Sequence, residues 1–245
     1  MNSYFIFFFI IVFFGATSSI SFADNIYYIG EKNCRIVNPN PIANERITWT
    51  GKCENGFANG IGVLQWYQEN KPKNKFEGSI KNGEYEGYGV FSLISGDKFR
   101  GIFSHGKFNG YGIYTKLDGT KYEGNFVNAK LNGFGKILYT KKIYNKDEFY
   151  KYHKYTSYEG YWINNKFEGQ GILHYADGAK YEGNFKNENF DGAGIYTSND
   201  GTQYIGKYIN GKEDGDFYIK YKDGTIAKTT FINGKMMNFP QDIKK

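Results

Sequence analysis

The hexapeptide KYEGNF decides the fold, and it occurs twice, at Lys121–Phe126 and at Lys180–Phe185. The copies start 59 residues apart (180 − 121). Around both copies an aromatic residue opens a unit, a glycine follows two positions later, and a Gly-x-Gly begins eleven positions after the opening (87 − 76). Such internal periods indicate a repeat protein. The units open at Phe76, Phe99, Tyr122, Tyr158, Tyr181 and Tyr204.

The regular period is 23 residues (99 − 76), and two turn signals recur within it. Asn-Gly, His-Gly or Asn-Ala pairs stand at 82–83, 105–106, 128–129 and 210–211, and Asp-Gly pairs stand at 118–119, 177–178, 200–201 and 223–224. These dipeptides tolerate positive φ and mark β-hairpins. Each unit is therefore predicted to be a strand, a tight turn, a second strand and a second tight turn.

Alternation along a strand puts Tyr122, Gly124 and Phe126 on one face and Glu123 and Asn125 on the other. In a single-layer sheet the rings must cover neighbouring backbone, and adjacent glycines make room for them. The sequence predicts an all-β protein, an elongated single-layer antiparallel sheet of tandem β-hairpin repeats. The residues assigned to this scaffold are Gly78, Gly101, Gly124, Gly160, Gly183, Gly206, Tyr122, Phe126, Tyr158, Trp162, Tyr181 and Phe185.

The pattern YEGNFxNxxxxGxGIxxxxDG resembles the MORN repeat over about residues 47–238. The segment from Cys34 to Gly62 is similar to the cysteine-bearing lead-in of exported bacterial MORN proteins. MORN arrays also accompany lipid kinase and methyltransferase domains, but no residues remain here to form one. The predicted organisation is a lead-in and cap at 24–46, a repeat array at 47–238 with partial repeats at 47–75 and 227–238, and a tail at 239–245.

Residues 1–23 read as a cleavable signal peptide. The apolar run Phe5–Phe14 is too short for a membrane span of about 20 residues, and Ser21 and Ala23 suit a signal peptidase. An uncleaved anchor is the alternative. We therefore expect an exported protein of a bacterial periplasm or medium.

Export makes the two cysteines, Cys34 and Cys53, readable as a disulfide that ties an N-terminal cap. Closing this loop would stabilise the fold by about 3 kcal/mol in the chain-entropy model. A metal pair or a reactive thiol is the alternative, and neither has a supporting cluster of His or further Cys.

The sequence contains no recognisable catalytic motif. The Gly-x-Gly pairs lack the third glycine and the strand-to-helix context of a phosphate-binding loop. His105, His153 and His174 have no metal-site or general-base spacing. We predict a protein that is not an enzyme, has no cofactor or metal and binds no nucleic acid.

Glu77, Glu123, Glu159 and Glu182 form an acidic ladder one repeat apart or more. The favoured interpretation is a solvated stripe paired with lysines such as Lys121 and Lys180, and a cation site is the alternative.

One interval departs from the frame, because Tyr122 and Tyr158 are 36 residues apart (158 − 122), which leaves an insertion at about 141–157. Insertions in repeat arrays often lie on the binding face, and interleaved Lys and Tyr suit a polar partner or anionic headgroups. An elongated hairpin with ordinary solvated charges is the alternative. The candidate partner-binding residues are Lys141, Lys142, Lys146, Tyr150, Lys151, Tyr152 and Lys154.

The leading functional hypothesis is a scaffold that binds another protein, because repetition comes without a catalytic motif. Peripheral binding to anionic lipids through the insertion is the second hypothesis, and an accessory part of an envelope or lipid enzyme is the third. A homodimer through the exposed sheet ends is also consistent with the sequence.

Overall fold

The computed structural model describes residues 28–140 and 155–244. The protein is all-β, and its strands form one open, mostly antiparallel sheet of hairpins. The predicted signal peptide and residues 141–154 of the predicted insertion lie outside the described residues. The strands are β1 (Tyr28–Glu31), β2 (Cys34–Val37), β3 (Glu45–Trp49), β4 (Lys52–Glu54), β5 (Gly56–Gln68), β6 (Lys71–Lys81), β7 (Glu84–Ser92), β8 (Lys98–Ser104), β9 (Lys107–Thr115), β10 (Lys121–Val127), β11 (Lys130–Leu138), β12 (Tyr155–Ile163), β13 (Lys166–Tyr175), β14 (Lys180–Lys186), β15 (Asn189–Thr197), β16 (Gln203–Ile209), β17 (Lys212–Glu213), β18 (Gly215–Lys220), β19 (Ile226–Ile232), β20 (Lys235–Met236) and β21 (Gln241–Lys244).

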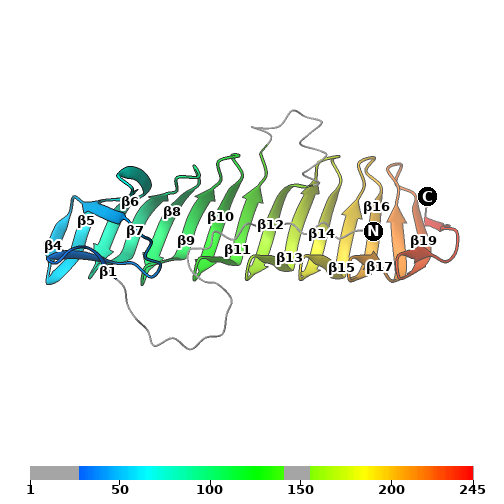
Figure 1. Cartoon of the computed structure of the whole chain (residues 1–245). Helices are drawn as coiled ribbons and strands as arrows, with labels where there is room; N and C mark the ends of the chain where they lie inside the picture. The colour runs from blue at the N-terminus through cyan, green and yellow to red at the C-terminus, as the bar shows by residue number, and fades with distance from the viewer. Residues whose placement is uncertain (1–27, 141–154, 245) are drawn as a thin grey trace. The chain divides into compact units, whose positions relative to one another are not determined.

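The chain divides into two compact units. The first contains the described residues 28–117 and 125–130, and the second contains 118–124, 131–140 and 155–244. In the first unit β3 and then β5 to β9 pair in order. In the second unit β11 to β16, β18 and β19 pair in order. Figure 1 shows the strands of each unit side by side.

A disulfide between Cys34 and Cys53 ties the N-terminal cap, which consists of β1, β2 and β4. The predicted disulfide and antiparallel sheet are confirmed, with one local exception. Strand β2 runs parallel to β5 and pairs Cys34 with Gly56. The backbone N–H of Val37 donates to the carbonyl of Gly83 at 2.9 Å, so the cap also contacts the first full hairpin.

Two kinds of turn alternate along the array. At Asn82–Gly83 both residues have positive φ, 49° and 81°, as a two-residue type I′ hairpin requires. The Asp-Gly turns are three-residue loops instead. In one of them the N–H of Tyr175 donates to the carbonyl of Ala179 at 2.9 Å, and the Asp177 carboxylate accepts the N–H of Ala179 at 3.0 Å. The sequence predicts both turns but not their difference in length.

The type I′ turns are also bonded to the preceding hairpin. The N–H of the second turn residue donates to a carbonyl of that hairpin, as Gly106 does to Tyr85 at 3.1 Å and Gly211 to Phe190 at 2.8 Å. The first turn residue donates its N–H to a side-chain oxygen of that hairpin, as His105 does to Glu86 at 3.0 Å and Asn82 to Asn59 at 2.9 Å. Each such turn therefore joins two repeats.

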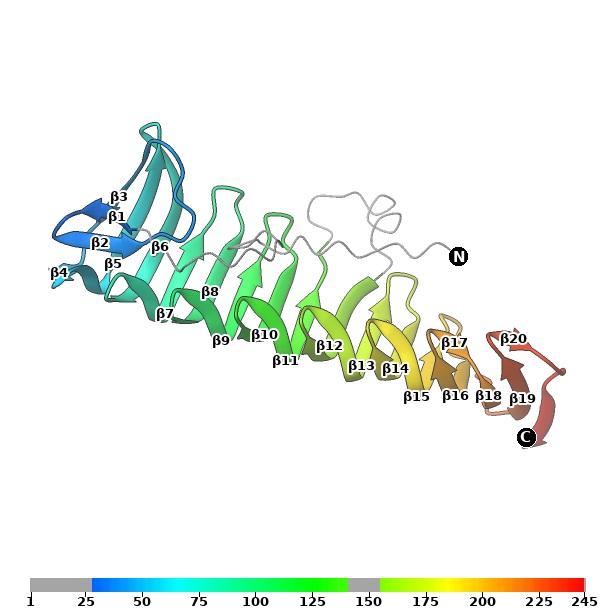
Figure 2. The same ribbon diagram turned by 60° about the horizontal axis from the view of Figure 1, so that its bottom comes forward.

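The first glycine of each Gly-x-Gly produces a β-bulge. Gly87, Gly133 and Gly169 have φ of 82°, 80° and 65°, which L side chains rarely adopt. Between β12 and β13, Gly160 pairs with Gly171 while the next residue, Tyr161, pairs with Glu168. The extra residues bend the second strand, as bulges do. Figure 2 shows the bend as the curled lower ends of the hairpins.

The second glycine of each Gly-x-Gly belongs to a row of cross-strand glycine pairs. In the second unit Gly135, Gly160, Gly171, Gly183, Gly194 and Gly206 pair one after another. A Cβ on Gly171 would lie 2.6 Å from the Tyr158 ring, so this ring rests on the glycine backbone. The Tyr158 hydroxyl then donates to the carbonyl of Tyr161 at 2.9 Å. The predicted packing of rings on glycine is confirmed.

The rings share one side of the sheet, called here the ring face, which carries Phe76, Tyr158 and Tyr181; the opposite side is the open face. Tyr158 stacks on Phe167 with ring centroids 3.7 Å apart and meets Trp162 edge-on at 5.2 Å. All three side chains are buried. The glycine backbone covers only one side of these rings. The other side is covered by the start of each second strand, which the bulge folds over the ring face. The hydrophobic core therefore lies inside the bend of the hairpins.

The predicted C-terminal tail contains a strand. Strand β21 pairs with β19, and β20 completes the last hairpin. Likewise β12 begins at Tyr155, so residues 155–157 of the predicted insertion belong to a strand.

Replacing Gly183 with Ala should destabilise the protein by about 3 kcal/mol, the upper part of the range for overpacking. The new Cβ would lie 2.6 Å from the Gly194 Cα, which is backbone and cannot move aside. Gly178→Ala is the control, because it has open space and only the strain of φ 96°, about 1–2 kcal/mol. Urea denaturation checks the difference, and equal losses would contradict the packing account.

Replacing both Cys34 and Cys53 with Ser should lower stability by about 3 kcal/mol, because the loop that the disulfide closes spans 19 positions. The cap should open first, since few strand pairs hold it. Denaturation curves combined with limited proteolysis measure this. Cleavage that begins in the repeats and leaves β2 protected would contradict it.

Replacing Glu188 should stabilise the protein at neutral pH. Burial raises the pKa of the Glu188 carboxyl, and Lys166 lowers it in part. A carboxyl with a raised pKa destabilises the fold once it ionises, so the gain from Glu188→Gln should be absent at pH 4 and appear as pH rises through the raised pKa. Glu188→Gly should also raise the free energy of unfolding by about 1 kcal/mol at every pH, because it relieves the backbone strain of a non-glycine residue with φ of 69°. Urea denaturation at pH 4 and pH 8 separates the two effects.

Candidate binding site

The seven residues proposed from the sequence as a partner-binding segment lie outside the described residues. They are Lys141, Lys142, Lys146, Tyr150, Lys151, Tyr152 and Lys154.

The acidic ladder consists of ion pairs. Glu77, Glu123, Glu159 and Glu182 meet Lys75, Lys121, Lys136 and Lys180 at 3.0, 2.8, 2.9 and 3.4 Å. All are partly exposed, so each pair contributes about 1 kcal/mol or less. Within residues 28–140 and 155–244 no three His, Cys, Asp or Glu side chains gather as metal ligands would.

The histidines stand apart from one another. His105 lies in a turn, where its Nδ1 is 2.9 Å from the Ser104 hydroxyl, and His174 is exposed on β13. His153 is outside the described residues. No histidine therefore belongs to a described catalytic group.

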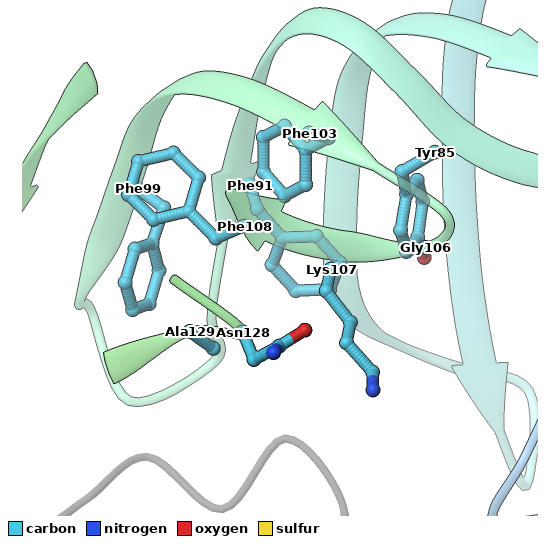
Figure 3. A pocket seen from close by; sticks show the side chains of 9 residues that line it. All are labelled: Tyr85, Phe91, Phe99, Phe103, Gly106, Lys107, Phe108, Asn128 and Ala129. Carbon is cyan, nitrogen blue, oxygen red and sulfur yellow. The ribbon is translucent and has the colours of Figure 1, made fainter. Parts of the chain in front are cut away.

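A hollow of about 120 Å³ opens on the ring face of the first unit. Its walls come from β7, β8 and the start of β9, together with the turn that follows β10. Figure 3 shows the aromatic side chains grouped together and the Lys107 ammonium directed away from them. The lining residues are Tyr85, Phe91, Phe99, Phe103, Gly106, Lys107, Phe108, Asn128 and Ala129.

The walls of the hollow are rigid. Phe103 and Phe108 have centroids 5.1 Å apart, as do Phe99 and Phe108, and Tyr85 lies 5.7 Å from Phe103. The four Phe side chains are buried, so each ring is held by its neighbours. Close-packed rings of this kind keep their positions when a ligand enters or leaves.

The polar groups of the hollow are few. Burial raises the pKa of the Tyr85 phenol well above its ordinary value, so this hydroxyl stays neutral. Within the described chain it has no hydrogen-bond partner. Lys107 and Asn128 are exposed at the mouth and bring one cation and one amide. The hollow thus offers an aromatic floor, hydrogen-bond donors and a positive charge.

The hollow coincides with a change in the repeat. In the hairpins opened by Tyr122, Tyr158 and Tyr181, the opening ring covers the second glycine of the Gly-x-Gly. In the hairpin opened by Phe99 that place is taken by Phe108, and Phe99 stacks instead on Tyr114 at 4.5 Å. Phe76 also lacks the hydroxyl that anchors Tyr158 to a carbonyl, yet its ring still covers the second glycine of its own hairpin, Gly89. The Phe at position 99 is therefore not a sequence signal for the hollow.

Residues 28–140 and 155–244 contain no helix that is long and apolar enough to cross a bilayer.

Comparison with solved structures gave, among other matches, the TCP domain of SAS-4 (dCPAP) from Drosophila melanogaster, solved in complex with a proline-rich motif of Ana2 (dSTIL). The two chains are 11% identical, the match covers 69% of this chain and 84% of that chain, and the TM-score is 0.39. No curated protein sequence matched this one.

Comparison with protein families gave the MORN repeat, which matches residues 54–71, 76–98, 99–121, 122–142, 158–180 and 181–203. The matched segments cover more than half of the 245 residues. This chain therefore belongs to the MORN repeat family and carries six matched repeats.

Proposed function

We propose that this protein is a non-enzymatic binding module whose aromatic hollow holds one aliphatic side chain of a partner protein, next to an acidic residue of that partner. The observation that carries the proposal is the hollow itself, with five rings around about 120 Å³.

The volume fits a single side chain. An apolar cavity of about 150 Å³ can hold a benzene molecule, so a slightly smaller hollow suits the branched end of Leu, Ile or Val. Burying such a side chain contributes roughly 1.5–3 kcal/mol. Anchors of this size, set in rigid aromatic pockets, supply much of the binding energy of protein interfaces.

The rim adds selectivity. The Lys107 ammonium favours a carboxylate beside the anchor, and the neutral Tyr85 hydroxyl can donate to a backbone carbonyl of the partner. A hydrogen bond of this kind contributes about 0.5–1.5 kcal/mol. The same groups support binding over catalysis, since a protonated phenol, an amide and an exposed lysine contain no matched acid and base.

The exported location remains part of the proposal. It is supported by the composition of residues 1–23 and by the disulfide of Cys34 and Cys53, because disulfides persist in oxidising compartments.

Displayed random linear peptides selected on the full mature chain provide the probe. The enriched peptides should share an aliphatic residue beside an acidic one. Lys107→Glu should weaken their binding about tenfold, and Tyr85→Phe should weaken it about fivefold, consistent with one charge pair and one hydrogen bond. The matched control is Lys130→Glu, because Lys130 also follows a type I′ turn but does not line the hollow.

The proposal fails if no peptide is enriched, or if the enriched peptides bind Lys107→Glu and Tyr85→Phe as tightly as the wild type. Sedimentation with phosphatidylglycerol vesicles at low and high salt tests the lipid alternative. Salt-sensitive vesicle binding that disappears when residues 141–154 are deleted would favour that alternative.

A further inference from the structure

The open face of the first unit carries an apolar stripe, which consists of two rows of side chains across β5 to β9. The first row contains Ile61, Tyr88, Ile102 and Tyr111, which are 82%, 57%, 41% and 56% exposed. Ser79 completes it on β6, opposite Ile61. Exposed apolar side chains grouped on one face can mark an interaction site of a soluble protein.

The second row lies two residues along each strand. Register pairs connect Val63 to Glu77, Glu77 to Val90, Val90 to Arg100 and Arg100 to Ile113. The order across five strands is therefore apolar, acidic, apolar, basic, apolar. The order is therefore symmetric about Val90 on β7, with an apolar residue at each end. The two charged residues lie on either side of Val90 and have opposite signs.

We propose that the apolar stripe binds a second copy of this chain, with the two-fold axis parallel to β7. Rotation about that axis places β6 of one copy over β8 of the other at the same height. Glu77 then faces Arg100 of the partner subunit, and the same contact occurs twice, as an isologous interface requires. The apolar residues of β5, β7 and β9 meet apolar residues, and Ile102 meets Ser79 of the partner subunit. A two-fold axis perpendicular to the strands would instead set Arg100 against Arg100 of the partner subunit.

The remaining charges limit the affinity. Glu77 already pairs with Lys75 at 3.0 Å, both side chains being largely exposed. Lys98 and Arg100 form no ion pair within the described residues. In the proposed dimer Lys98 would lie at the rim near Lys75 of the partner subunit, and like charges at an exposed rim repel weakly.

The dimensions also indicate a weak dimer. Five strands at about 4.8 Å spacing span about 19 Å, and two rows with their margins span about 13 Å. The area of a stripe with these two dimensions is below the roughly 800 Å² per partner found in standard stable interfaces. We therefore expect dissociation in the micromolar range or above.

The proposal is independent of the hollow, which lies on the ring face. A variant such as Tyr88→Ser should lose self-association and still bind the peptides selected on the hollow. Failure of one proposal can thus be told from failure of the other.

Analytical ultracentrifugation of the full mature chain from about 5 to 500 µM tests the proposal. Arg100→Glu and Glu77→Arg should each weaken dimerisation at least tenfold. Each substitution places two like charges face to face, and the symmetry of the dimer repeats this contact a second time. The double variant Glu77→Arg with Arg100→Glu should restore it to within about threefold of the wild type. Lys98→Glu should strengthen it by removing the repulsion at the rim.

The control is Ile163→Ser, an exposed apolar residue of the second unit that lies outside the stripe; it should leave dimerisation unchanged. Circular dichroism establishes that every variant is folded. A protein that stays monomeric over the whole range would overturn the proposal. So would dimerisation that the double variant fails to restore, because only the exchange of Glu77 and Arg100 between copies explains a rescue.

Discussion

The contact between an aromatic ring and a pair of glycines is the interaction on which this fold depends. In a single-layer sheet, apolar side chains cannot be buried against a second sheet or a helix. In this repeat an aromatic ring packs instead on glycine backbone, as Tyr158 does on Gly171. Because the glycines of neighbouring strands are register partners, the same contact recurs in hairpin after hairpin. Rings bound in this way also touch rings of the next hairpin, so stability passes from neighbour to neighbour.

The two glycines of the Gly-x-Gly have separate physical tasks. The second makes room for a ring, and the first adopts positive φ in a bulge that bends its strand over the ring face. The bend explains how side chains such as Trp162 are fully buried in a sheet with a single layer. A motif that looks like one signal in the sequence therefore encodes both the floor and the cover of the core.

Much of the fold follows from the sequence because its determinants are local. The opening aromatic residues, the turn dipeptides and the spacing of Cys34 and Cys53 each act through neighbours a few residues or one repeat away. The bend was not predicted, because Gly87 and Gly89 are the same letter and differ only in φ. The candidate site was missed for a similar reason: it depends on which ring, Phe99 or Phe108, covers Gly112, and that choice is made by packing. The predicted partner segment at 141–154 lies outside the described residues, so it stays a prediction.

The two kinds of turn give the two edges of the sheet different capacities for change. At the type I′ edge each turn is hydrogen-bonded to the preceding hairpin, so extra residues there would break contacts between repeats. At the Asp-Gly edge the loops of the later repeats close on themselves, as in the bond from the Ser198 N–H to the Thr202 carbonyl, and β11 and β12 keep their glycine register across a long connection. The long connection between Leu138 and Tyr155 stands at this second edge. Evolution, or a protein engineer, can therefore graft new sequences onto one edge of such an array while the other keeps the repeats in step.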